Sequence, residues 1–200
     1  MSNGRHTQTK SALQLQMVWP GITQEPPRIP EVAAGYVLRL FKPAEKILHE
    51  RLMISAGFSD WTAARLQEVL GRALPGGFFV VEHTQTGALV ATAMATHNPT
   101  DLHPFGGELG WVACDPAHRR KGLGTAVCGA VTRLFLALGY TDIYLRTDDW
   151  RLPAIAMYLK LGYVPLLFAP EMEHRWMTVF EQLGRPWDRK SAVVWRKTPG

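Results

Sequence analysis

Residues 111–126, WVACDPAHRRKGLGTA, carry three consecutive cations into a Gly-x-Gly sequence that lies between two apolar segments. The segment 108–114 is typical of a strand, and the segment 123–139 has apolar residues at helical spacing. A helix N-terminus has unpaired N–H groups and a partial positive charge, and glycine lets an anion approach that backbone closely. Positive side chains at this end oppose the helix dipole unless an anion is bound. We therefore predict a strand–turn–helix that binds a phosphate group.

The alternative is a structural turn whose basic residues are simply solvated, which is the commoner meaning of an isolated Gly-x-Gly. The strand before the turn and the helix after it favour the phosphate interpretation. The turn is not a P-loop, because no Gly-Lys-Ser or Gly-Lys-Thr ends it. It also lacks the third glycine of a dinucleotide fingerprint, since Val127 stands at that position after Gly122 and Gly124.

The rest of the chain alternates between strand-like and helix-like segments. Alternating or apolar runs predict strands at 35–41, 78–84, 88–98, 108–114, 142–149 and 163–168. Helical spacing predicts helices at 44–57, 61–74 (capped by Asp60), 123–139, 153–162 and 171–184. Strands and helices in this order predict an α/β sheet with parallel pairs in its second half.

Length and composition fit one domain of ordinary size. The chain has 200 residues, of which 46% are hydrophobic, so it can build a core. Residues 1–31 are polar and end in a proline-rich stretch, so we expect a flexible N-terminal segment there. We expect the main domain at 32–170 and a helical extension at 171–200.

Composition also argues against several classes of partner. No apolar run is long enough to cross a bilayer and the first residues lack a secretory signal, so we expect a cytoplasmic protein without membrane contact. The net charge of +5 admits nucleic acid, but the basic residues are scattered apart from 119–121 and 189–197, so we expect no nucleic-acid partner. Cys114 and Cys128 have no metal-ligand spacing, and we expect no metal site.

Two short motifs carry a resemblance to a known family. The Arg/Gln-x-x-Gly-x-Gly/Ala signature of the GCN5-related N-acetyltransferase (GNAT) superfamily is matched by Arg119, Gly122 and Gly124, and the sequence resembles that family from about 35 to 168. Its second signature resembles 153–165, where the slots are filled by Ala154, Met157, Tyr158, Gly162 and Tyr163. Arg151 departs from the family, which usually has Asn there. The segment 144–163 is further similar to mycothiol synthase-type members, but this likeness is too short to indicate a substrate.

The resemblance implies a fold, a co-substrate and its contacts. The implied fold is α/β, a single mixed, mostly antiparallel sheet with a parallel βαβ second half and helices on both faces. The implied co-substrate is acetyl-CoA, whose pyrophosphate sits on the turn formed by Arg119, Arg120, Lys121, Gly122, Leu123, Gly124 and Thr125. The pantetheine arm is implied to run beside Trp111, Val112, Ala113 and Cys114, where a backbone N–H can polarise the thioester carbonyl.

Acyl transfer to an amine requires a base for the amine, a polarised carbonyl and an acid for the departing thiolate. Glu108 is the candidate base, because related enzymes place a glutamate on this strand; the alternative is a solvated or salt-bridged residue. Tyr158 is the candidate acid, because the family places a tyrosine here near the sulfur; the alternative is a tyrosine that packs in the core. Asp148 and Asp149 either bind a cationic acceptor or cap the following helix.

These features predict an acetyl-CoA-dependent N-acetyltransferase in which an amine of a small molecule or peptide attacks the thioester directly. Two alternatives stay open: transfer of a larger acyl group, and a non-catalytic sensor module that binds acyl-CoA. No part of the sequence carries a recognisable code for the acceptor. The extension 171–200 can supply an interface for a homodimer.

Overall fold

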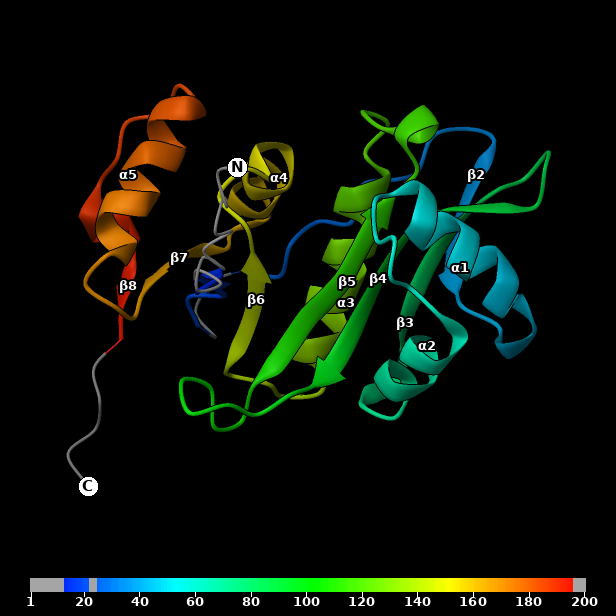
Figure 1. The fold of residues 1–200 in the computed structure, drawn as a ribbon, viewed down its shortest axis with the longest axis horizontal. Helices are drawn as coiled ribbons and strands as arrows, with labels where there is room; N and C mark the ends of the chain where they lie inside the picture. The colour runs from blue at the N-terminus through cyan, green and yellow to red at the C-terminus, as the bar shows by residue number, and fades with distance from the viewer. Residues whose placement is uncertain (1–12, 22–24, 196–200) are drawn as a thin grey trace, which may run out of the picture.

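Residues 13–21 and 25–195 are described by the computed structural model, and they form one sheet with helices on both faces (Figure 1). The sheet order is β2-β3-β4-β5-β6-β1-β7-β8. The strands are β1 (Leu15–Val18), β2 (Tyr36–Leu40), β3 (Ala73–His83), β4 (Ala88–His97), β5 (Gly107–Cys114), β6 (Ile143–Thr147), β7 (Val164–Leu167) and β8 (Val193–Val194). The helices are α1 (Lys46–Ser55), α2 (Ala63–Leu70), α3 (Leu123–Ala137), α4 (Leu152–Leu161) and α5 (Met172–Gln182).

The predicted mixed α/β architecture is confirmed. Strands β2 to β5 pair antiparallel, and β5 pairs parallel with β6 after the crossover through α3. Each face of the sheet has its own core, because successive strand residues point to opposite faces. Val80 packs with Leu52 of α1, whereas Val81 packs in the core that contains Val131 of α3. Helices α1 and α2 therefore cover one face, and α3 covers the other.

The N-terminal segment corrects one prediction, because part of 1–31 is a strand inside the sheet. Strand β1 pairs antiparallel with β6 on one side and with β7 on the other. Leu15 and Met17 are fully buried. The chain then passes α3 at Gly129, where a side chain would contact Arg28 and Ile29. The parts of the prediction that concern 1–12 and 22–24 lie outside the described residues.

Strand β1 also modifies the second half of the sheet. Strands β6 and β7 run in the same direction, as the βαβ order predicts, but β1 separates them. Strand β8, which we did not predict, pairs parallel with β7 at the edge. Helix α5 of the predicted extension buries Trp176 in the same core as β1 and α3. The pairing of two copies of the chain stays a prediction.

Both predicted boundaries of α2 are wrong. The helix begins at Ala63 because the Thr62 side chain, and not that of Asp60, accepts a hydrogen bond from the Arg65 N–H at 3.2 Å. Strand β3 begins at Ala73, where we expected the helix to continue. The proline and glycines at 75–77 fall at a register shift within β3, so these residues mark an irregularity in a strand rather than the end of a helix.

A buried histidine lies in the core beneath α1. The His49 ring is fully buried between Phe41, Phe78 and Trp61. Neither ring nitrogen has a hydrogen-bond partner in the described part of the chain. Burial lowers the pKa of His49 to about 4. The folded protein therefore holds this ring neutral at pH values where the unfolded chain protonates it.

We expect the His49→Leu variant to lose less stability in acid than the native protein. Because the folded pKa is depressed, the contribution of neutral His49 is complete above about pH 6.5 and declines as the pH falls toward 4, by roughly 3 kcal/mol in all. Urea unfolding across this range measures the difference. The exposed His174 provides the control, since His174→Gln should follow the native curve. Parallel curves for native protein and His49→Leu would contradict the assignment.

Candidate active site

The central feature of the site is the divergence of β5 from β6. The two strands share only the pairs Gly107↔Ile143 and Glu108↔Tyr144. Beyond these pairs β5 stays with β4, whereas residues 144–147 of β6 pair with β1. The strands therefore separate toward α4 (Figure 1). A cleft of about 430 Å³ opens there, lined by both strands, the α1–α2 connection and α4.

A bulge distorts β5 on one wall of this cleft. The register with β4 shifts between Thr92 and Met94, so that β5 has one extra residue. Trp111 lies at this point with a φ of 53°, in the left-handed region that bulky residues rarely adopt. Its ring is held by Trp61, with the centroids 4.8 Å apart. Such strain persists only when the surroundings enforce it, and a bulge leaves backbone groups outside the strand ladder.

The turn after β5 presents a row of free backbone amides. Arg120 and Gly122 both have a positive φ, of 62° and 75°. Among the described residues, no group accepts a hydrogen bond from the amides of 119–125, and the first to find an acceptor is Ala126, which donates to the Gly122 carbonyl. Successive free N–H groups in this conformation form an anion-binding concavity at the start of α3. The structure thus brings the seven predicted phosphate contacts together, while phosphate binding itself stays a prediction.

One cation of the turn is used to fix it in place. The Lys121 Nζ donates to the Tyr36 hydroxyl of β2 at 2.7 Å, and this hydroxyl lies 2.8 Å from His118 Nδ1. Because the ammonium group can only donate, the Tyr36 hydroxyl accepts from Lys121 and can donate its own hydrogen bond to His118 Nδ1. Arg119 and Arg120 are exposed. Among the described residues, these two guanidinium groups are therefore the cations of the turn without a hydrogen-bond partner.

Gly124 has a structural role that the sequence did not predict. A Cβ at this position would lie 3.1 Å from the Met157 Sδ of α4. The absence of a side chain therefore permits close packing of α3 against α4, and close approach of an anion is not the sole reason for glycine here. At Gly122 a Cβ would meet nothing within 4 Å, so its positive φ is the constraint.

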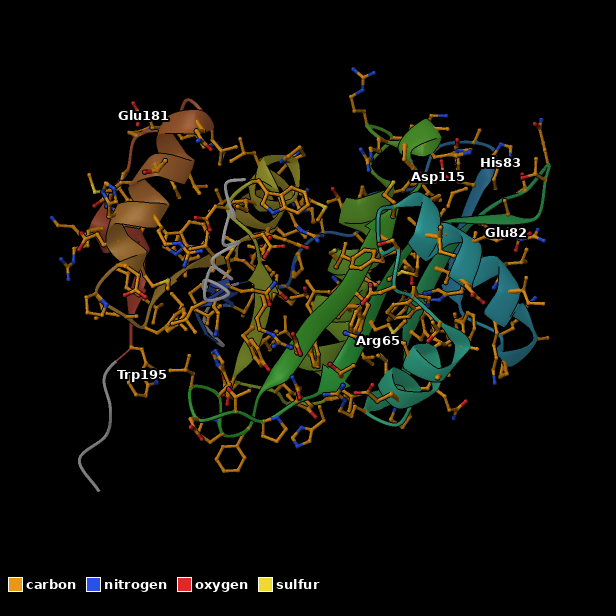
Figure 2. All side chains as sticks on the ribbon, in the orientation of Figure 1. Arg65, Glu82, His83, Asp115, Glu181 and Trp195 are labelled. Atoms are coloured by element: carbon orange, nitrogen blue, oxygen red, sulfur yellow. The ribbon has the colours of Figure 1, made fainter. Side chains whose placement is uncertain are left out.

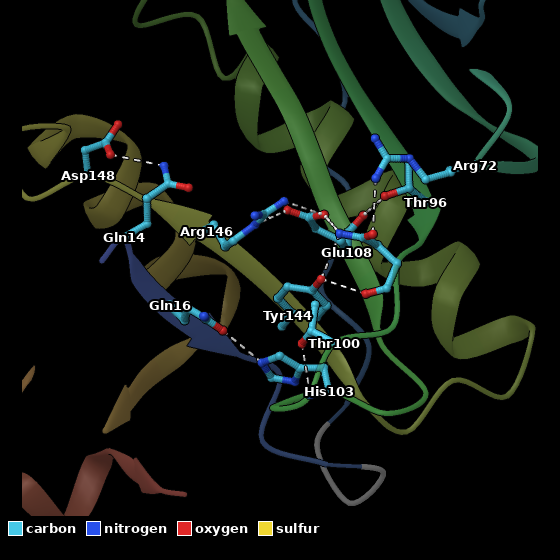
Figure 3. Close-up of polar contacts among 11 residues, drawn as sticks. Gln14, Gln16, Arg72, Thr96, Thr100, His103, Glu108, Tyr144, Arg146 and Asp148 are labelled. Carbon is cyan, nitrogen blue, oxygen red and sulfur yellow. Dashed lines mark hydrogen bonds and ion pairs between the residues drawn. The ribbon is translucent and has the colours of Figure 1, made fainter. Parts of the chain in front are cut away.

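Glu108 is buried at the floor of the cleft and is held by two neighbours (Figure 3). Its Oε1 accepts from Arg146 Nε at 2.7 Å, and its Oε2 accepts from Asn98 Nδ2 at 2.6 Å and from Arg146 Nη2 at 3.1 Å. The backbone carbonyl of Asn98 also accepts a hydrogen bond from the Tyr144 hydroxyl. The salt-bridged alternative is therefore what the structure describes, although Oε1, with one donor, keeps a lone pair for a second.

Tyr158 projects from α4 into the cleft and is almost wholly buried. Burial raises the pKa of its hydroxyl well above the usual value, so the phenol keeps its proton at neutral pH. No described residue forms a hydrogen bond with it, in contrast to Tyr163, whose hydroxyl lies 2.9 Å from Thr132 Oγ1. The hydroxyl therefore has a proton to donate and no protein acceptor.

The remaining candidates have structural partners. Burial raises the pKa of Cys114, so this thiol stays protonated at neutral pH. The Asp148 carboxylate accepts from Arg151 Nε at 2.9 Å and from Gln14 Nε2 at 3.1 Å. Asp149 pairs with Arg175 of α5 at 2.6 Å. Neither aspartate side chain caps α4, which corrects that alternative.

Several cleft residues were not identified from the sequence. Gln14, Phe58, Asp60, Arg65, Arg72, Arg146 and Arg151 all line the cleft. They come from three separate parts of the chain, at 14, 58–72 and 146–151, and Arg65 reaches the cleft from α2 (Figure 2). Within the described residues there is no cluster of three His, Cys, Asp or Glu side chains suited to a metal ion, and no helix has the length and apolarity to span a bilayer.

Comparison with known proteins agrees with this geometry. Residues 38–163 match the model of a family described as the Acetyltransferase (GNAT) family. The chain is 29% identical over 176 residues to a mycothiol acetyltransferase of Saccharomonospora viridis, covering 82% of this chain and 54% of that protein. It is 27% identical over 187 residues to a mycothiol acetyltransferase of Frankia casuarinae, covering 86% and 53%. The chain thus spans about half the length of these curated relatives.

A solved structure supports the fold. A GCN5-related N-acetyltransferase from Sphaerobacter thermophilus superposes with a TM-score of 0.58 at 19% identity, covering 76% of this chain and 49% of that one. At this identity the likeness concerns the fold alone.

We expect Gly122→Asp to weaken the binding of coenzyme A much more than Gly122→Asn. Both residues tolerate a left-handed backbone and both have room, so the pair differs in charge alone. A carboxylate beside the free amides repels a diphosphate, which should separate the two dissociation constants at least about tenfold, or ~1.4 kcal/mol. Isothermal titration calorimetry measures both. Equal affinities would show that the diphosphate is held elsewhere.

Proposed function

Because the chain belongs to the GNAT acetyltransferase family, we propose that it transfers an acetyl group from acetyl-CoA to an amine of a small molecule or peptide. The observation that supports this most is the row of uncapped amides at 119–125, directly after the strand that lines the cleft. Amides and guanidinium groups at a helix N-terminus suit the pyrophosphate of coenzyme A. Residues 109–114 of β5, which have no partner on β6, lead along the chain from the cleft toward this turn.

In this proposal acetyl-CoA supplies a thioester, and β5, with its bulge at Trp111, supplies a backbone donor that polarises the thioester carbonyl. The pantetheine arm runs beside residues 111–114 of β5, which lack a strand partner on the side facing β6. A backbone N–H near Trp111 donates to the thioester oxygen, whose negative charge grows as the amine attacks. The strained conformation holds this donor in place before the reaction, so no reorganisation is needed during it.

Tyr158 acts as the general acid. The amine nitrogen forms a bond to the acetyl carbon, the carbon–sulfur bond breaks, and the sulfur takes the phenolic proton of Tyr158. The raised pKa keeps this proton available at neutral pH, and the hydroxyl has no competing protein acceptor among the described residues. The proton lost by the amine passes to Glu108 Oε1 and from there to solvent, and Tyr158 is reprotonated from solvent.

Glu108 serves as the base and also orders the floor of the cleft. Its Oε1 faces one donor, which leaves a lone pair toward the acceptor side. Arg146 and Asn98 fix the direction of the carboxylate. In this role Glu108 accepts the amine proton as the nitrogen attacks, because bond formation to the carbonyl carbon makes that nitrogen acidic.

The proposal is tested by the release of free coenzyme A thiol from acetyl-CoA in the presence of a panel of thiol-free primary amines. An acetyltransferase releases thiol only when an acceptor is present. A sensor module binds acetyl-CoA without release, and that result would overturn the proposal. Propionyl-CoA and longer acyl-CoA esters in the same assay identify a transferase of larger acyl groups.

Tyr158→Phe should lower kcat by about 10²-fold or more, the usual contribution of a general acid, and leave the affinity for acetyl-CoA within about twofold. The lost hydroxyl is needed when the thiolate departs and makes no contact that the cofactor turn depends on. Tyr140→Phe is the matched control, because its hydroxyl contacts His97 outside the cleft. A native kcat in Tyr158→Phe would remove this residue from the mechanism.

A further inference from the structure

Two arginines are mounted on aromatic rings across the cleft. The Arg65 guanidinium of α2 lies over the Trp111 ring at 5.2 Å, and that of Arg151 lies over the Phe58 ring at 5.4 Å. The Trp111 and Phe58 rings contact one another, with centroids 6.3 Å apart. All four residues line the cleft. These four side chains, here called the stack, form a continuous series of contacts, Arg65–Trp111–Phe58–Arg151, in which the two rings are tilted by 58° to one another. The Arg151 guanidinium also lies over the Trp150 ring at 4.6 Å.

The two guanidinium groups of this stack are only partly paired with other protein groups among the described residues. Among the described residues, the Arg65 side chain forms no ion pair and no hydrogen bond. Arg151 gives its Nε to Asp148, and neither of its Nη groups has a described partner. Arg72 and Arg146 differ, because they pair with Glu68 and Glu108.

Stacking on an aromatic ring fixes the plane of a guanidinium and leaves its edge free to donate. The edge of the guanidinium fork matches an anion such as a carboxylate with two parallel hydrogen bonds. Less side-chain entropy is then lost when the anion binds, because the ring already limits the rotamers. The stack is therefore a preorganised anion site on the acceptor side of the cleft.

We propose that the acceptor is an amine that also carries an anionic group, a carboxylate or a phosphate, and that the positive charge of Arg65 and Arg151 in the cleft selects this group. The inference rests on the proposed acetyltransferase function and narrows its acceptor class. Arg151 occupies the position where the family resemblance leads one to expect Asn, so the charge is a property of this chain. Asp60, which lines the same cleft without an ion pair among the described residues, adds a carboxylate suited to the cationic end of such an acceptor.

The test compares amines in matched pairs, with release of coenzyme A as the readout. One pair is β-alanine and β-alaninamide, and the other is phosphoethanolamine and ethanolamine. The anionic member should have a kcat/KM at least about tenfold higher in one pair or both, the usual effect of a charged hydrogen bond. The pair that shows the larger ratio identifies the anion as carboxylate or phosphate.

The variants Arg65→Gln and Arg151→Asn should each reduce this preference about tenfold, chiefly through a higher KM for the anionic member. Arg133→Gln, an exposed arginine on α3 on the opposite face of the sheet, should keep the native ratio. Arg151 is the N-cap residue of α4, so Arg151→Asn can disturb the start of that helix. Arg65 is exposed on α2, so Arg65→Gln should keep the fold and provides an independent test.

Failure of the inference is distinct from failure of the proposed function. Equal acetylation of charged and neutral amines would overturn the anion site and keep the transferase. Equal preferences in Arg65→Gln and Arg133→Gln would likewise overturn the anion site alone. Binding of acetyl-CoA without acetylation of any amine in the panel would overturn both.

Discussion

The separation of β5 from β6 after two residue pairs is the constraint on which the rest of the site depends. Each strand is committed to another neighbour, β5 to β4 and β6 to the inserted β1. Beyond the two shared pairs, the edges of β5 and β6 that face one another have no ladder partner among the described residues. Glu108 marks the point of separation, and Tyr158 lines the opening that results, while the turn at 119–125 follows the C-terminal end of β5. The N-terminal strand is therefore part of the architecture that creates the cleft.

Electrostatics divides the site into two regions. On the turn side, free amides and two solvent-facing arginines present a positive potential suited to a diphosphate. On the acceptor side, ion pairs neutralise Glu108 and Asp148, while Arg65 lacks a described partner. Burial also favours the proposed role of Tyr158, because it raises the pKa of the hydroxyl and so keeps it protonated. Each region thus carries the charge that its proposed ligand requires.

Local spacing predicted those features that depend on neighbours in sequence. The strand–turn–helix around 119–125 and the β3–β4 hairpin follow from short patterns, whereas the place of Tyr158 near the site was implied by the family resemblance of residues 153–165. Strand β1 also has a sequence signal, since the apolar residues at 13, 15, 17 and 19 alternate with Gln14, Gln16 and Val18. This signal is weak because the strand has four residues and lies in a polar segment. The bulge at Trp111 and the pairing of Glu108 with Arg146 had no such signal, because both are set by contacts between distant segments.

Amide hydrogen exchange of the whole chain, measured with and without acetyl-CoA, tests the central claim most directly. We expect acetyl-CoA to slow exchange in the peptide covering 119–125 and in residues 111–114 of β5, because these amides become donors to the ligand. Saturation with acetyl-CoA that left exchange in both segments unchanged would contradict this assignment of the cofactor site.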